Sequence, residues 1–393
     1  MLKTVYVLAA RRTPVGSFMG ALANVPAPKL GAVAIEAALK EAGVKPEAVS
    51  QVYMGCVLSA GIGQAPARQA AIFAGLPKST PCTTVNKVCG SGMKAVMLAA
   101  QSIETGESEV VVAGGMENMS LVPHLLENSR NGYRMGHQKM TDGMIKDGLW
   151  DPYNDFHMGN AAELCAKELK FSREAQDQFA IQSFKRAQDA IKNGHFKKEI
   201  APVAIQQKKG DPVLVDTDEG PGKAQFDKIP KLSPVFIKDG TVTAANASTI
   251  NDGASALVLA SEEYVKRAGA KPIAKLVSYS QFAQAPEWFT TAPVEAARKV
   301  LKSSSWEVKD VDLWEVNEAF AVVAMASRQE LGIDEAKLNV HGGGVSLGHP
   351  IGSSGARILV TLIHALGTHG KRKGLASICI GGGEATAVTL ERV

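Results

Sequence analysis

The feature that most constrains the fold of this chain is a pattern of strand, glycine-rich turn and apolar helix that occurs twice. In the first round a short strand ends at Gly55 and Cys56, and Cys89 follows just before the turn and helix. In the second round a strand ends at Asn317, and His349 follows at a spacing one residue shorter. Each round continues into a further strand that ends in a cluster of glycines. The two rounds predict an internal duplication, and two unrelated βαβ units are the alternative.

Strands and helices alternate in both rounds. The residue patterns predict strands at 4–10, 49–54, 83–88, 110–113, 254–260, 273–280, 311–316 and 375–380, and helices at 28–43, 66–75, 93–103 and 355–366. Such alternation is typical of an α/β fold with a mostly parallel sheet that helices cover on both faces. Between residues 120 and 249 apolar runs are rare, apart from one polar helix predicted at 163–192. In an enzyme, an insertion of this length usually forms a lid or a binding loop.

Composition and charge narrow the class of protein. At 393 residues the chain is long enough for two or three domains, and 45% apolar and 21% charged residues are ordinary for a soluble globular protein. The formal net charge is only +4, and the longest basic run is Lys371-Arg372-Lys373. These values argue against a nucleic-acid-binding surface and are compatible with a polyanionic small-molecule ligand.

The five cysteines, at positions 56, 82, 89, 165 and 379, contain no CxxC pair. Their odd number predicts a reducing compartment and argues against a disulfide framework or a zinc site, so we expect no metal centre. The N-terminus lacks the long apolar region of a signal peptide, and no apolar run approaches the roughly 20 residues that span a bilayer. The C-terminal residues 391–393 are not a peroxisomal address. We therefore expect a cytoplasmic protein without a membrane partner.

Cys89 is the first candidate catalytic residue because it lies between a strand and a helix. Gly90 and Gly92 permit a tight turn at this point. The unpaired N–H groups and the dipole of the following helix are expected to lower the pKa of the thiol and make it a nucleophile. The alternative is a buried, inert cysteine that packs as a small hydrophobic residue. If the two halves pack about a pseudo-twofold axis, Cys89 meets His349, and Cys379 lies close by.

These side chains suit acyl transfer through a thioester. A histidine can take the proton of a cysteine nucleophile. Gly348 and Pro350 flank His349 inside a glycine-rich segment, which a histidine that only packs in the core would not need. A second cysteine, with an unperturbed pKa of about 8.5, can both take and return a proton at carbon. The glycine clusters at 342–344 and 381–383 expose N–H groups that could face a developing oxyanion. Together these features predict thioester acyl transfer coupled to making or breaking a carbon–carbon bond.

Six sequence blocks carry a resemblance to a known family. They span almost the whole chain and are Asn86–Gly92, His157–Asn160, Thr243–Gly253, Asn317–Ala321, Gly342–Arg357 and Cys379–Gly383. In this order they resemble the thiolase family, and within it the short-chain acetyl-CoA acetyltransferases. The combination of the cysteine block, NEAFA, GHP and the C-terminal CxGGG is highly specific.

The resemblance implies a role for each of five catalytic residues. Cys89 carries the acetyl group, and His349 activates Cys89 and helps to hold the thioester oxygen of the substrate. Cys379 removes the α-proton of the second acetyl-CoA. Asn317 positions a water that completes the oxyanion site for the enolate. The backbone N–H groups of Cys89 and Gly381 form a second oxyanion hole, for the carbonyl of the acetyl-enzyme.

The resemblance also implies contacts with coenzyme A and a closed acyl pocket. Met158 and Phe320 resemble the wall that keeps this pocket short, and Ser248 resembles a contact to the pantetheine arm. No arginine for the nucleotide phosphates is evident, so Lys223 or Lys228 is expected to take its place. The full set of implied contacts is Ser248, Leu149 on the same lid, Met158, Phe320, Ala319 and Lys223.

The implied fold is a duplicated thiolase fold, a five-layered αβαβα sandwich with an inserted loop domain. Residues 1–119 with 250–271 form the N-terminal half, residues 120–249 form a loop domain over coenzyme A, and residues 272–393 form the C-terminal half. The implied activity is a reversible condensation of two acetyl-CoA molecules into acetoacetyl-CoA and CoA by a ping-pong route through acetyl-Cys89. Coenzyme A thioesters are then the substrates, no cofactor is permanently bound, and the working form is a homotetramer.

Two departures limit what the resemblance carries over. Some animal mitochondrial relatives bind potassium through a tyrosine where this chain has Glu219–Lys223 without a tyrosine. The same relatives have Phe-Pro where this chain has Phe289 and Thr290. Neither potassium activation nor acceptance of 2-methyl-branched substrates is therefore carried over.

Four other functions are the alternatives. The nearest is a 3-ketoacyl-CoA thiolase of broader chain length in fatty-acid degradation, and His157 and Met158 favour the short pocket over it. A decarboxylating ketoacyl synthase has a second histidine where this chain has Cys379. A thiolase-like lipid-binding protein without catalysis would not need the three reactive residues Cys89, His349 and Cys379. A nicotinamide-dependent dehydrogenase lacks support because no GxGxxG follows the first predicted strand.

Overall fold

The computed structural model describes residues 3–393, so Met1 and Leu2 of the predicted N-terminal half lie outside the described residues. The first half contains strands β1 (Val5–Arg12), β2 (Gly16–Ser17), β3 (Gln51–Gly55), β4 (Cys82–Val85), β5 (Val110–Asn118) and β12 (Asn251–Ser261), with helices α1 (Ala27–Ala42), α2 (Pro66–Phe73) and α3 (Ser91–Glu104). After α6 (Glu262–Ala268), the second half contains strands β13 (Ala274–Ala283), β14 (Leu313–Val316), β15 (Lys373–Ile380) and β16 (Glu384–Arg392), with helices α7 (Ala292–Ser304), α8 (Ala321–Leu331), α9 (Gly344–Leu347) and α10 (Ile351–Thr368).

Both halves have the same strand order, which confirms the predicted duplication. The first half runs β4-β3-β5-β12-β1, and the second runs β14-β15-β16-β13. A parallel bridge between Trp314 and Leu338 lies beside β14 in the place that β4 occupies beside β3. β1 also pairs antiparallel with β13, so the strands of both halves belong to one hydrogen-bonded sheet.

The expectation of a mostly parallel sheet is wrong. Among the described residues, the strand pairs that run parallel are β3–β4, β3–β5 and β14–β15, and the other pairs of the large sheet are antiparallel. Residues 375–380 were expected to be the last strand, but β16 follows and returns along β15 after the glycine turn at 381–383. Alternation with helices describes only the early strands of each half. A tight turn or a long insertion joins the later strands, and neither imposes a parallel direction.

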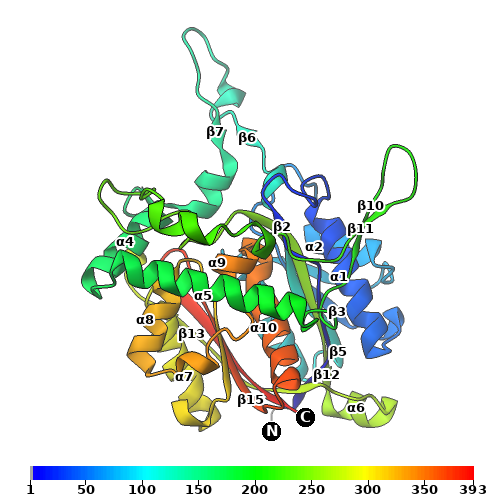
Figure 1. The fold of residues 1–393 in the computed structure, drawn as a ribbon. Coiled ribbons are helices and arrows are strands. Elements are labelled where there is room, and N and C mark those ends of the chain that lie inside the picture. The colour runs from blue at the N-terminus through cyan, green and yellow to red at the C-terminus, as the bar shows by residue number, and fades with distance from the viewer. Residues whose placement is uncertain (1–2) are drawn as a thin grey trace.

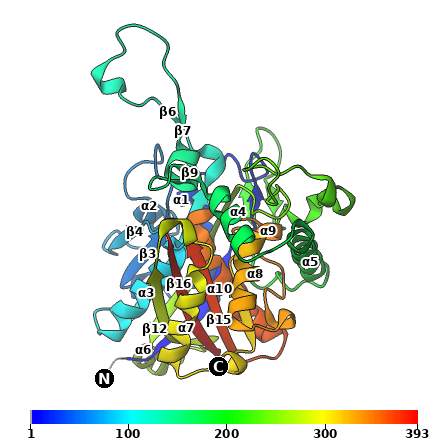
Figure 2. The same ribbon diagram turned by 90° about the vertical axis from the view of Figure 1, so that its left-hand side faces the viewer.

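Helices and sheet halves pack into the five predicted layers (Figures 1 and 2). α1 and α2 cover the outer face of the first half, α7 and α8 cover the outer face of the second, and α3 and α10 form the middle layer between them. A Cβ on Gly92 of α3 would lie 2.8 Å from the backbone nitrogen of Ala356, and one on Gly355 of α10 would lie 2.5 Å from that of Met93. The two middle helices therefore touch along their backbones, which only glycine allows.

Residues 119–250 form an insertion over one end of the sandwich (Figure 1). The sequence predicts one helix at 163–192, but α4 (Met158–Glu168) and α5 (Arg173–Lys192) are separate, because the Ser172 hydroxyl accepts the N–H of Ala175 and caps a new helix. A long arm projects from the body (Figures 1 and 2). The strands of the insertion are β6 (His124–Leu125) and β7 (Thr141–Asp142) in the arm, β8 (Trp150–Asp151), β9 (Phe156–His157), β10 (Val203–Ile205) and β11 (Val213–Val215).

No helix in the described part of the chain combines the length and hydrophobicity that crossing a bilayer requires.

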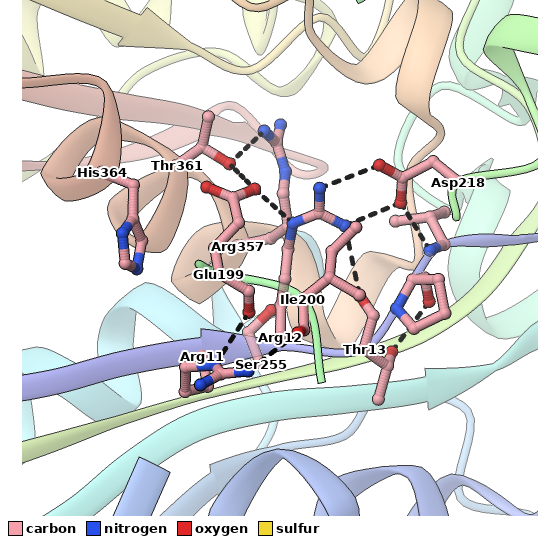
Figure 3. A network of polar contacts seen from close by, with 12 residues as sticks. Arg11, Arg12, Thr13, Glu199, Ile200, Asp218, Ser255, Arg357, Thr361 and His364 are labelled. Atoms are coloured by element: carbon pink, nitrogen blue, oxygen red, sulfur yellow. Dashed lines mark hydrogen bonds and ion pairs between the residues drawn. The ribbon is translucent and has the colours of Figure 1, made fainter. Parts of the chain in front are cut away.

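A buried ionic network joins this insertion to the first strand (Figure 3). The fully buried guanidinium of Arg12 donates to Glu199 at 2.6 Å and, through two nitrogens, to the Asp218 carboxylate at 2.7 and 2.8 Å. Asp218 also accepts the N–H of Val15, and the Thr361 hydroxyl of α10 donates to Glu199. Charged hydrogen bonds at these distances hold the insertion in register with β1 and α10.

Replacing Arg12 with alanine should lower the free energy of unfolding by about 3–5 kcal/mol, because Glu199 and Asp218 then keep buried charges without a partner. Urea unfolding followed by circular dichroism measures this change. The control is Arg267→Ala, which breaks an exposed ion pair with Glu109 and should change stability little. Equal losses in the two variants would contradict the structural role of Arg12.

Candidate active site

Cys89 stands in a tight loop between β4 and α3. Val88 has a φ of +45°, which strains a β-branched residue, and the side chain of Ser91 holds this conformation. The Ser91 hydroxyl accepts a backbone N–H of the loop at 2.8 Å and donates to the Val88 carbonyl at 2.6 Å. A Cβ on Gly90 would overlap the side chain of Ile380, so the loop packs closely against the end of β15. The loop therefore presents Cys89 to the C-terminal end of β15.

Two backbone donors and a second thiol surround the Cys89 sulfur. Burial raises the pKa of the Cys89 thiol to about 11, although the N–H groups of Gly381 and of Cys89 itself favour the thiolate. The Cys379 thiol is close enough to interact electrostatically with that of Cys89. The prediction that the helix N-terminus lowers the pKa of Cys89 is therefore wrong. The N-cap of α3 is Gly90, and the loss of hydration at the sulfur outweighs the nearby N–H groups.

Cys379 is fully buried near the end of β15. Burial and the neighbouring Cys89 raise the pKa of its thiol, although the side chain of Asn317 and the N–H of Ala319 favour the thiolate. The sequence-based expectation of a thiol that titrates near neutral pH is therefore contradicted. The Asn317 amide is also buried, and neither its nitrogen nor its oxygen has a hydrogen-bond partner among residues 3–393. This unpaired amide beside a thiol can bind a water or a substrate oxygen.

His349 lies in the turn before α10, with its Nε2 available as a base. Its backbone N–H donates to Asn251 at 2.9 Å, and its Nδ1 lies 2.6 Å from the Ser354 hydroxyl. Since that hydroxyl donates to the Pro350 carbonyl, it accepts from Nδ1–H, which leaves Nε2 unprotonated. Nε2 is buried and has no hydrogen-bond partner in the described chain. Burial and the charge of Arg357 lower the pKa of His349 to about 3, so the imidazole is neutral.

The starts of α3 and α10 bring these two turns to the same end of the middle layer. A Cβ on Gly92 would lie 3.1 Å from the carbonyl oxygen of Gly352. Gly92 and Gly352 each lie three residues beyond Cys89 and His349. The two glycine turns of the duplicated pattern thus lie side by side, and a direct contact of the sulfur with the imidazole stays a prediction.

A cavity of about 630 Å³, within the usual size range of ligand sites, opens under the insertion. Ser248 and Lys223, two of the residues predicted to contact coenzyme A, line it together with Lys228. The N–H of Ser248 donates to the carbonyl of Ala319 at 2.9 Å, which joins the cavity wall to the segment beside Cys379. Leu149, Met158, Ala319 and Phe320 are not among the lining residues of this cavity, so their contacts with coenzyme A stay predictions.

Each of the two residues predicted to close the acyl pocket has a neighbour in the site. The sulfur of Met158 would be 3.4 Å from a Cβ on Gly381, which places Met158 beside a donor to the Cys89 sulfur. Phe320 packs edge-on against Phe236, which lines the cavity and stacks on His157 with ring centroids 4.8 Å apart. Sequence reasoning missed Phe236, because an isolated aromatic residue in an irregular segment carries no periodic signal.

Comparison with known proteins decides the family. The thiolase N-terminal domain matches residues 5–263 and the thiolase C-terminal domain matches residues 270–392. The chain belongs to the thiolase family. Acetyl-CoA acetyltransferase of Cupriavidus necator is 54% identical to this thiolase over 389 residues, which cover 99% of each chain. Acat5 thiolase from Ascaris suum, solved in complex with coenzyme A, is 44% identical with a TM-score of 0.95 over 100% of both chains. The acetyl-CoA acetyltransferase of Bacillus anthracis is 41% identical with a TM-score of 0.97, covering 100% of this thiolase and 99% of that chain.

The raised pKa of Cys89 should confine its alkylation in this thiolase to alkaline pH. Because the thiolate is the reactive form, the rate with iodoacetamide should rise about tenfold per pH unit between about pH 7 and pH 10. Mass spectrometry of the peptide that carries Cys89 measures this rate. A short peptide with blocked ends and one cysteine is the control, and its rate should level off above its ordinary pKa of about 8.5. A plateau for Cys89 in the same pH range as the control would contradict the raised pKa of its thiol.

Proposed function

We propose that this thiolase is an acetyl-CoA C-acetyltransferase, which joins two acetyl-CoA molecules reversibly into acetoacetyl-CoA and free CoA. The observation that carries the proposal is the environment of one sulfur, since two backbone N–H groups and the Cys379 thiol all act on Cys89. One thiol can hold an acetyl group while the other moves a proton of the second substrate. The relatives named acetyl-CoA acetyltransferase, at 41% to 54% identity over nearly the full chain, support the same activity.

In the first half-reaction, Cys89 attacks the thioester carbon of acetyl-CoA. His349 Nε2 takes the thiol proton as the new carbon–sulfur bond forms, the bond to the CoA sulfur breaks, and the proton passes to CoA as it leaves. The N–H groups of Cys89 and Gly381 then hold the carbonyl oxygen of the acetyl-enzyme. Their position at the sulfur supports this role, as does the free Nε2 of His349 in the described chain.

In the second half-reaction, the Cys379 thiol gives its proton to Nε2 of His349, and the resulting thiolate takes a proton from the methyl carbon of another acetyl-CoA. A water held by the Asn317 amide faces the enolate oxygen, together with Nε2 of His349 when that atom carries the proton. The enolate carbon attacks the acetyl group, the bond to Cys89 breaks, and the Cys89 sulfur recovers a proton from Nε2 of His349 as acetoacetyl-CoA forms. The buried, unpaired amide of Asn317 beside Cys379 supports this assignment.

Coenzyme A is proposed to occupy the cavity of about 630 Å³, and its thioesters are substrates rather than permanent cofactors. Its pantetheine arm would run along Ser248 and Ala319 towards Cys89, beneath a lid that includes Leu149. Lys223 and Lys228 line the same cavity and would face the nucleotide phosphates. Met158 and Phe320 would then limit the acyl group to a short chain.

We further propose the division into residues 1–119 with 250–271, a loop domain of 120–249, and residues 272–393. The equal strand order of the two halves supports this division. The proposed working form is a cytoplasmic homotetramer. The five free cysteines fit a reducing compartment, and a further copy of the chain would cover the exposed Leu126, Met135 and Met140 on the arm. Light scattering after size-exclusion chromatography tests the tetramer.

Two cysteine variants should separate the half-reactions. Cys89→Ala should form no acetyl-enzyme from labelled acetyl-CoA, because it lacks the nucleophile. Cys379→Ala should still be acetylated at Cys89 but should lose condensation, because nothing removes the α-proton. Label retained on Cys89→Ala, or normal condensation by Cys379→Ala, would contradict the assigned roles. Cys82→Ala, which lies outside the site, is the control for both and should behave as the wild type.

Removing the Met158 side chain should lengthen the acyl pocket. Met158→Ala is expected to raise kcat/KM for thiolysis of longer 3-ketoacyl-CoA relative to acetoacetyl-CoA by about tenfold or more, as pocket-size changes of a few methylenes do. Met140→Ala on the projecting arm is the matched control and should leave the ratio unchanged. An unchanged ratio for Met158→Ala would contradict the wall. A wild-type preference for long chains would instead favour the broader 3-ketoacyl-CoA thiolase.

A further inference from the structure

Glu117 is a buried carboxylate that the proposed reaction does not use. It lies near the end of β5 and is 0% exposed. Its oxygens accept the N–H groups of Val57 at 3.0 Å, Leu58 at 3.2 Å and Gly352 at 3.0 Å. The Cys56 thiol donates to it at 3.8 Å. No lysine or arginine among residues 3–393 forms a salt bridge with it, so three backbone N–H groups and one thiol satisfy a buried carboxylate.

These donors come from two elements that belong to the site. Val57 and Leu58 follow the end of β3, whereas Gly352 lies in the first turn of α10, three residues beyond His349. A Cβ on Gly352 would lie 2.7 Å from the Glu117 carboxylate, so glycine is needed for this close approach. A carboxylate at a helix N-terminus is stabilised by the free N–H groups and the dipole of the helix. Glu117 therefore ties the start of α10 to the end of β3.

The duplication gives Glu117 the same place in the first half that Cys379 has in the second. Gly55, at the end of β3, pairs with Gly115 of β5, and Val316, at the end of β14, pairs with Ser377 of β15. Two residues beyond these partners stand Glu117 and Cys379. Both of them act electrostatically on the Cys89 sulfur. The carboxylate and the second thiol thus approach the nucleophile from the two halves of the sheet.

We propose that Glu117 is a positioning residue for acetyl transfer, whose carboxylate fixes the first turn of α10, and with it the His349 imidazole, next to Cys89. The inference rests on the proposed acetyltransferase function. The backbone N–H of His349 is held by Asn251 on the other side of the turn. The backbone around His349 is therefore held by two anchors from outside α10, one from β12 and one from β5, while Ser354 orients the imidazole itself.

Protonation of Glu117 should release one of these anchors at neutral pH. Burial raises the pKa of Glu117 to about 7, although the N–H groups of Val57, Leu58 and Gly352 favour its ionised form. The titratable groups that face it are the thiols of Cys56 and Cys89, and α10 contributes only an N–H. As the pH falls through about 7, the carboxylate takes up a proton and the contact with Gly352 weakens. Burial lowers the pKa of His349 to about 3, so we expect its imidazole to stay neutral through this range.

The experiment is a single-turnover assay of CoA release from acetyl-CoA by the full-length protein, measured between about pH 5.5 and pH 8.5. The wild type should show an acid limb near pH 7. Glu117→Gln should be about ten- to a hundredfold slower at the upper end, as expected for loss of a charged hydrogen bond, and should lack the limb. Glu117→Asp retains a titrating group and should restore the limb at a reduced rate. Cys56→Ala keeps all three backbone contacts and should stay within about twofold of the wild type with the limb intact.

A wild-type rate and limb in Glu117→Gln would overturn the positioning role while leaving the acetyltransferase function in place. If Glu117→Gln fails to fold, Glu117→Asp tests the inference instead. Its shorter side chain cannot keep all the contacts of Glu117, so a wild-type rate in that variant would overturn the positioning role. A slow Gln variant that keeps the limb near pH 7 would also overturn the inference, because another group would then be titrating. No CoA release by the wild type at any pH would overturn the proposed function and the inference with it.

Discussion

The direct contact between the backbones of α3 and α10 is the constraint on which the site depends. Gly92 and Gly355 stand where any Cβ would meet the backbone of the facing helix. Because both helices start at this crossing, the turns that precede them, with Cys89 and His349, lie at one end of the middle layer. The duplicated sheet then delivers Cys379 and Glu117 to the same place from its two halves. Residues far apart in sequence are thus brought together by one close helix pair.

Burial gives this site its electrostatic character. The pKa of Cys89 is raised to about 11 and that of His349 is lowered to about 3, so thiol and imidazole are both neutral before substrate binds. A neutral pair costs less to bury than a thiolate–imidazolium pair. The proton then moves when the thioester is attacked and the developing oxyanion meets the N–H groups of Cys89 and Gly381. The buried charges of Arg12, Glu199 and Asp218, by contrast, are paired with one another in a separate network.

Local sequence signals predicted much of this arrangement, and long-range packing decided the rest. The end of α1 at Gly43, the glycine turns and the duplicated spacing could be read directly, because each rests on a short-range backbone requirement. The antiparallel return of β16 could not be predicted, since a glycine turn permits a hairpin but does not require one. The raised pKa of Cys89 was missed because desolvation depends on neighbours that converge only in three dimensions. Phe236 and Glu117 were missed because nothing near them in sequence marks an ordinary side chain as part of a site.

The proposed reaction requires that the sulfurs of Cys89 and Cys379 face each other although they belong to different halves of the chain. Treatment with a short bifunctional alkylating reagent at alkaline pH, followed by mass spectrometry of the digested protein, tests it most directly. The structure predicts one covalent bridge between the peptides that carry Cys89 and Cys379, blocked by prior acetylation with acetyl-CoA. A bridge from Cys89 to any other cysteine, or single alkylation of each thiol without a bridge, would contradict the convergence on which this account rests.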